Sequence, residues 1–292
     1  KNIFIDGVFS WHIKQPIYLT GFHVLIFITA FLLYSVWYFN KNKTILFVMI
    51  AVSLSFLYYY NVLIPSALAI LYFESIFSIG AILNKYFFTR DNHSKRALYV
   101  DFITGLLSWL VIALILSSLN IGSITNLKIM TLIIGVPALV LNINNLNCKH
   151  IYNNLLIFSK KELAFVSLIL VIILMQFAKG NIGYDFDSLW YGLRPEQVLI
   201  PNNSFYENIG LLQLAHYYPK LVELFFIPLS FSNHYSFILA GNTVVLILLT
   251  VLTYRIFILL KVERILSLLF TLLIISIPTI NNLASTAKTD IF

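Results

Sequence analysis

The sequence predicts an all-α integral membrane protein, a polytopic helical bundle of about eight transmembrane helices. Of its 292 residues, 60% are hydrophobic and 11% are charged, and the mean hydropathy is +0.88. A soluble domain of this length needs more polar side chains to cover its surface. The apolar blocks run for about 20 residues without the alternation of a strand, which is typical of helices that cross a bilayer.

Eight apolar segments are long enough to span the hydrocarbon core of a membrane. Pro16 and Pro65 stand where two of these helices are expected to begin, because proline suits the first turn of a helix. The predicted spans are 17–39, 44–62, 65–85, 101–119, 127–144, 162–178, 235–259 and 265–281.

A further apolar run, KLVELFFIPLSF at 220–231, is shorter and carries Glu223 in its middle. If this run does not cross, twelve Lys and Arg residues fall on one side of the membrane and seven on the other. That distribution agrees with the positive-inside rule. We therefore expect 220–231 to lie along the interface as a juxtamembrane helix, after a large extracytoplasmic loop over 179–234. Both ends of the chain are then also extracytoplasmic.

The chain divides into five N-terminal spans over 1–160 and a second part over 161–292. It lacks an initiator Met and stops at STAKTDIF, so a fragment of a longer protein is expected. The net charge of +7 needs no nucleic acid as partner, since membrane proteins concentrate basic residues in cytoplasmic loops. The single cysteine, Cys148, excludes an internal disulfide, and its neighbours NLNCKH predict a loop.

Charge inside the predicted spans is scarce, and Glu74 is the exception. A carboxylate at the centre of a span costs about 2.5–3.5 kcal/mol on insertion scales, so it must face protein or be protonated. A contact between helices is the favoured interpretation, and a functional role is the alternative.

The stretch NIGYDFDSLWYGLRPEQVL at 181–199 places Asp185 and Asp187 directly after an apolar span. Carboxylates just outside the membrane suit chemistry on a lipid-anchored substrate, whose phosphate head lies at the interface. Such a reaction needs a base for the acceptor nucleophile, and these two residues are the candidates. The alternative is that both carboxylates merely cap the amphipathic helix that follows.

The same reaction also needs positive groups beside the phosphate leaving group. Candidates for this role are Arg194, Lys220 and Lys288, which can form charge-assisted hydrogen bonds with phosphate oxygens. His216, in LAHYYPK, can assist either the base or the phosphate partners.

The order of YDFDSLWYGLRPEQVL, LAHYYPKLVELFFIPLS and ILAGNTVVLILLTVLTYRIF resembles the GT-C superfamily of membrane glycosyltransferases. Those enzymes carry an acidic residue in the first extracytoplasmic loop, commonly followed four residues later by Tyr, and Asp187 and Tyr191 fit this pattern. A His/Pro-rich entry to a juxtamembrane helix comes next, and His216 and Pro219 fit it. The resemblance covers about 160–292.

ASTAKTDIF after the last span resembles a second acidic loop position of the superfamily and places Asp290 near the site. The chain has Gly192 and Arg194 where related sequences often have His and Pro, which leaves the subfamily and substrate open. The five preceding spans look like an N-terminal addition to the superfamily core.

The resemblance implies a polyprenyl-phosphate-linked sugar as donor and glycosyl transfer with inversion on the extracytoplasmic face of the cell membrane. Asp187 would activate the acceptor hydroxyl, and Tyr191 and the basic residues would contact the substrate. Some members hold a divalent cation, Mg or Mn, on acidic loop residues, and Asp290 is the candidate ligand here. We expect Asp290 to lie within about 10 Å of Asp187, close enough to share one metal or substrate.

Three alternatives remain open from the sequence. A cell-envelope polysaccharide polymerase or ligase would carry paired arginines in the large loop, where only Arg194 is present. A transporter or flippase would place charges in several spans, where Glu74 is nearly alone. A non-enzymatic membrane subunit is the third alternative, and the oligomeric state is not specified by any of these patterns.

Overall fold

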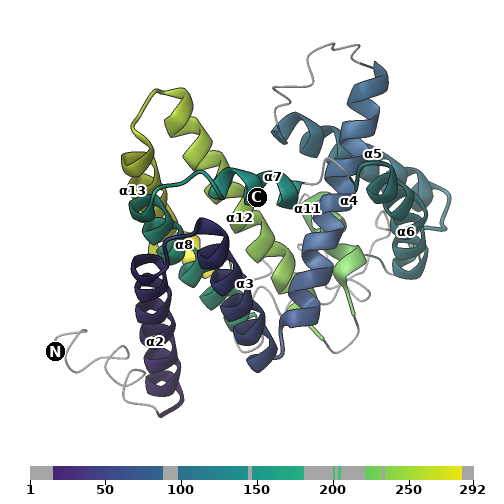
Figure 1. Cartoon of the computed structure of the whole chain (residues 1–292). Helices are drawn as coiled ribbons and strands as arrows, with labels where there is room; N and C mark the ends of the chain where they lie inside the picture. The colour runs from purple at the N-terminus through teal and green to yellow at the C-terminus, as the bar shows by residue number, and fades with distance from the viewer. Residues whose placement is uncertain are drawn as a thin grey trace.

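The computed structural model describes residues 16–87, 98–143, 147–180, 200, 203–204, 221–231 and 234–284, and over these ranges the ordered elements are helices (Figure 1). The long helices are α2 (Pro16–Tyr38), α3 (Asn42–Tyr59), α4 (Leu63–Phe87), α5 (Leu98–Ser118), α6 (Ile124–Leu141), α8 (Lys160–Lys179) and α12 (Ser236–Leu259). The shorter elements are α7 (Asn147–Leu155), α11 (Leu221–Phe226), the 3-10 turn η6 (Ile227–Leu229), α13 (Arg264–Ile275) and α14 (Pro278–Leu283).

The seven long helices are each long and apolar enough to cross a membrane. They coincide with seven of the spans that the sequence predicts. The prediction of an all-α, polytopic membrane bundle is therefore confirmed over the described residues.

The eighth predicted span, 265–281, is divided into two helices. α13 ends at Ile275, and α14 begins at Pro278. Proline has no backbone N–H, so it starts a new helix more readily than it continues one. The side chain of Asn281 donates from Nδ2 to the Ile275 carbonyl at 2.7 Å. This bond satisfies an acceptor that the break leaves without a helical donor, which matters most where no water is available.

α4 and α12 form the centre of the bundle. Of their most apolar windows, 67% and 61% of residues are buried, against 22–28% for α2, α3, α5 and α6. α4 lies between α5 and α6 on one side and α12 on the other (Figure 1). Because the outer helices are equally apolar, their exposed Leu, Ile and Phe side chains form the surface that lipid would cover.

α4 and α5 pack at backbone contact. A β-carbon added to Gly80 would overlap the Asp101 carbonyl oxygen, and one added to Gly105 would overlap the Ile76 carbonyl oxygen. Close approach through small residues is a common way for membrane helices to associate. Beside this contact, Asn84 donates from Nδ2 to Asp101 Oδ1 at 2.7 Å. The α4–α5 hairpin is thus held by both packing and a polar bond.

The stretch around Cys148, which predicts a loop, forms the nine-residue helix α7. It contains neither Gly nor Pro between Asn147 and Leu155, so nothing in its local chemistry interrupts a helix. The Asn residues of this stretch give only a weak local preference for a helix, because Asn competes with the helical backbone for hydrogen bonds.

Candidate functional site

The residues that the sequence predicts for catalysis, substrate binding and metal binding lie outside the described residues. They are Asp185, Asp187, Tyr191, Arg194, His216, Lys220, Lys288 and Asp290. The structure does describe the elements that flank the segments carrying these residues. They are the end of α8, the element formed by α11 and η6, and the end of α14.

A hydrogen bond between two buried amides joins α8 to α14. Gln176 donates from Nε2 to Asn281 Oδ1. The Gln176 side chain is fully buried, three residues before α8 ends at Lys179. Amide pairs of this kind hold helices together in an apolar environment, with double-mutant cycles averaging about 0.6 kcal/mol per bond.

A second bond joins α14 to the first turns of α12. Thr243 donates from Oγ1 to the Ala284 carbonyl at 3.2 Å. At the same level, a β-carbon on Gly180 would lie 3.4 Å from the β-carbon of Leu239. The end of α8, the beginning of α12 and α14 therefore lie at one end of the bundle. We call Gln176, Thr243, Asn281 and the Ala284 carbonyl the polar junction.

The polar junction is where two sequence segments of interest begin. The chain leaves it after Gly180 toward the segment that holds Asp185 and Asp187, and after Ala284 toward the segment that holds Asp290. The charge count of the sequence predicts that these ends share one side of the membrane. The hydrogen bonds add that the ends of α8 and α14 are direct neighbours.

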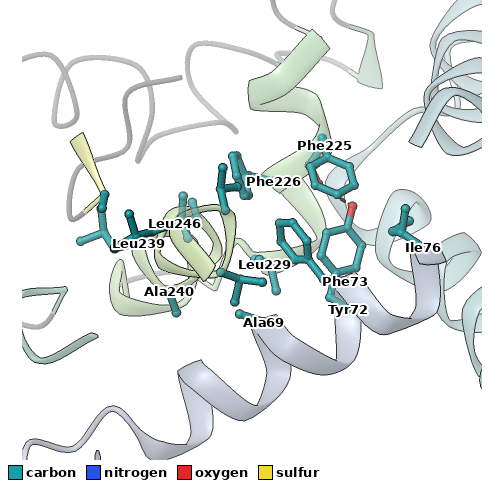
Figure 2. Close-up of a cluster of buried hydrophobic side chains, with 14 of the residues drawn as sticks. Ala69, Tyr72, Phe73, Ile76, Phe225, Phe226, Leu229, Leu239, Ala240 and Leu246 are labelled. Carbon is teal, nitrogen blue, oxygen red and sulfur yellow. Dashed lines mark hydrogen bonds between the residues drawn. The ribbon is translucent and has the colours of Figure 1, made fainter. Parts of the chain in front are cut away.

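The far end of the large loop is fixed by α11 and η6, which insert between α4, α5, α6 and α12. Leu224 and Phe225 are fully buried, and Ile227 is 1% exposed. The Phe225 ring lies 5.0 Å from that of Tyr72 (Figure 2). It also lies 6.0 Å from the ring of Trp109. We call Leu221–Phe226 and Ile227–Leu229 together the buried plug.

The sequence predicts that 220–231 lies along the interface as a juxtamembrane helix. The structure buries Glu223–Ser230 in the bundle, because LFFIPL has no polar face to leave in water, whereas Leu221 and Phe231 are 45% and 39% exposed. That the segment lies at the level of the interface stays a prediction. Its backbone is bonded to the bundle: the Tyr72 hydroxyl donates to the Phe225 carbonyl at 2.5 Å. On α12, Gly241 leaves room for the plug, since a β-carbon there would lie 2.6 Å from the Phe226 ring.

Two acids of the described residues near this element are buried. Glu223, in the first turn of α11, is 9% exposed, and Glu74 on α4 is 8% exposed. The burial of Glu74 agrees with the expected position between helices. Within the described ranges, no group of three or more His, Cys, Asp or Glu residues is placed to hold a metal ion.

Sequence reasoning did not single out Gln176, Asn281 or Tyr72 as residues that frame the site. A signal was present for two of them, because Gln176 is an isolated amide within a strongly apolar run and Asn281 belongs to an Asn pair at the end of one. Polar residues at such positions mark contacts between helices or functional sites. Nothing in the sequence marks Tyr72, since tyrosine is frequent throughout the chain.

The fold and this framework define a class, a multi-pass membrane protein built as an all-α bundle, with a long inter-helix segment anchored at both of its ends. A scan against models of protein families, a search of curated proteins and a search of solved structures each find no match for this chain.

Proposed function

We propose that this chain is an integral membrane glycosyltransferase. It would move a sugar from a polyprenyl-phosphate-linked donor to a glycan, lipid or protein acceptor on the extracytoplasmic side. The proposal is supported by the order of acidic loop, His/Pro-rich entry, apolar segment and span that resembles the GT-C superfamily.

The observation that carries the proposal furthest is the bond between Gln176 and Asn281. Two segments, one with Asp185 and Asp187 and one with Asp290, leave the bundle from neighbouring points. Five to seven residues of extended chain reach about 17–25 Å, so both acidic segments can arrive at one site beside the bundle. If the two segments left from opposite ends of the bundle, they could not reach a common site.

The proposed chemistry uses one carboxylate as base. Asp187 takes the proton of the acceptor hydroxyl while its oxygen attacks the anomeric carbon of the donor sugar. The bond between that carbon and the phosphate oxygen breaks, and polyprenyl phosphate leaves with the electron pair. Arg194, Lys220 and Lys288 neutralise the departing phosphate. His216 and Tyr191 orient the substrate.

The test measures release of polyprenyl phosphate from a panel of polyprenyl-phosphate sugars by the chain in nanodiscs, with cell-envelope extract as acceptor. Asp187→Asn is expected to reduce release by a factor of about 100, the scale of removing a positioned base. Asp185→Asn is the matched control, because loss of a helix cap costs only about 1 kcal/mol of stability.

Three results are informative. A large loss for Asp187→Asn with a small loss for Asp185→Asn supports the assignment. The reverse order would transfer the role of base to Asp185. No release above that of empty nanodiscs with any donor would overturn the proposed function.

A further inference from the structure

The nine-residue helix α7, between α6 and α8, has an apolar edge and a polar edge. Successive residues of a helix turn by about 100°, so Ile151, Tyr152 and Leu155 fall within an arc of about 100°. Asn153 lies on the opposite side of the helix. This is the pattern of a helix that meets an apolar phase on one side and water on the other.

The rest of the described chain covers the apolar edge of α7 only in part. Leu155 is half-buried and packs against a buried cluster that includes Leu32. Ile151 is 38% exposed and Tyr152 is 37% exposed, and Asn153 and Asn154 are exposed as well. An isolated helix shorter than about 12 residues is marginal in water. Packing of Leu155 against the bundle leaves Ile151 and Tyr152 partly exposed, and an apolar surface outside the bundle would complete the burial of this edge.

Hydrogen bonds fix the level at which α7 ends. Just after the helix, Asn42 donates from Nδ2 to the carbonyls of Leu156 at 2.8 Å and Phe158 at 2.7 Å. Next, Lys160 donates from Nζ to the Trp37 carbonyl at 3.0 Å. Asn42 begins α3 and Lys160 begins α8, so the exit of α7 is tied to the ends of membrane-spanning helices.

Aromatic side chains mark the same level as the edge of a membrane. Trp37 and Tyr38, at the end of α2, are 76% and 60% exposed. Exposed Trp and Tyr at the ends of spans are typical of the headgroup region, where an amphipathic ring is most stable. α7 also runs across the direction of α2, α3 and α4 in the view of Figure 1, which is the orientation of a helix parallel to a membrane surface.

We propose that α7 is an interfacial helix that binds the phospholipid surface. The exposed part of its apolar edge, formed by Ile151 and Tyr152, lies among the upper acyl chains, and Asn153 faces water. Binding of this kind scales with the apolar area that enters the bilayer. A protein partner is disfavoured as the cover, because the short connections to α6 and α8 hold α7 against the same bilayer that surrounds these spans.

The experiment uses the whole chain in nanodiscs of phosphatidylcholine and phosphatidylglycerol. Cys148→Ser removes the only cysteine, and Ile151→Cys and Asn153→Cys then provide a matched pair on opposite edges of α7. Each variant carries a nitroxide, and collisions with oxygen, which concentrates in lipid, are compared with collisions with a water-soluble nickel chelate. Circular dichroism and gel filtration verify that each variant is folded.

The nitroxide at position 151 should favour oxygen over the chelate several-fold relative to the nitroxide at position 153. Equal preference for the chelate at both positions would overturn the proposal, since α7 would then lie in water. Low accessibility to both quenchers at position 151 would also overturn it, since a protein surface would then be the cover.

Discussion

Gly80 and Gly105 are the residues at which a single added methyl group has the clearest cost. The backbones of α4 and α5 touch there, so a β-carbon has no flexible side chain to displace and must move a helix instead. α4 is the most buried of the seven spans, which makes its displacement costly to the whole bundle.

We expect Gly80→Ala to lower the free energy of unfolding by about 1–3 kcal/mol, the usual scale for overpacking a well-filled interior. Gly21→Ala is the matched control, because no atom lies within 4 Å of a β-carbon built on Gly21 in α2. Thermal unfolding in detergent measures both. Equal melting temperatures for the two variants would contradict the close contact of α4 and α5.

Two side chains of the polar junction, Gln176 and Asn281, contribute to stability through the hydrogen bond between them. We expect Gln176→Leu and Asn281→Leu to show coupled effects on stability, with an interaction energy of about 0.5–2 kcal/mol in a double-mutant cycle. Thr20→Val on α2 is the control: it lies outside the junction, and a second double-mutant cycle pairs it with Gln176→Leu. Additive effects for the pair Gln176 and Asn281 would remove the bond as a support for the site.

At the scale of elements, the buried plug is a short helix stabilised by its surroundings. Six residues cannot form a stable helix by themselves, so the plug depends on the rings and helices that enclose it. The contact of Phe225 with Tyr72 and Phe73 on α4 thereby fixes where the large loop returns to the bundle (Figure 2). Movement of this element would move the segment that carries His216 and Lys220.

We expect Tyr72→Phe to destabilise the protein by about 1 kcal/mol, because the Phe225 carbonyl loses its donor in an apolar interior. Tyr34→Phe on α2 is the control, since Tyr34 is 54% exposed. Chemical denaturation followed by tryptophan fluorescence compares the two. If the proposed function is correct, Tyr72→Phe should also lower the rate of sugar transfer.

At the scale of the whole molecule, the ends of the helices sort into two groups. The polar junction brings together the end of α8, the beginning of α12 and α14. At the other end, the bonds of Asn42 and Lys160 gather the end of α2, the beginning of α3 and the beginning of α8. The chain therefore alternates between two ends of the bundle, as a polytopic protein must.

Single cysteines test this alternation. In a Cys148→Ser background, His93→Cys and Asn203→Cys are expected to react with an impermeant maleimide from opposite faces of oriented membranes, with position 203 on the extracytoplasmic face. Labelling of both positions from one face would contradict the alternation and the placement of the candidate site. If position 93 were labelled from the extracytoplasmic face and position 203 from the cytoplasmic face, the alternation would hold and only the assignment of the two faces would be reversed.

The sequence by itself determined the fold class and most of the spans. Apolar runs of about 20 residues leave few other stable forms in lipid, so α2 to α6, α8 and α12 follow from composition and length. The candidate residues around Asp187 were also chosen from sequence alone, and because they lie outside the described residues their roles remain predictions.

The tertiary structure decided how apolar segments divide between protein and lipid. Hydropathy cannot distinguish the two, because a bilayer and a helical core are equally apolar. The sequence therefore placed 220–231 along the interface without showing what covers it. The contacts of Phe225 with Tyr72 and Phe73, and of Phe226 with Gly241, show that part of this run packs inside the bundle. The same limit hid the pairing of Gln176 with Asn281, since a hydrogen bond across 105 residues depends on which helices pack together and not on either local sequence.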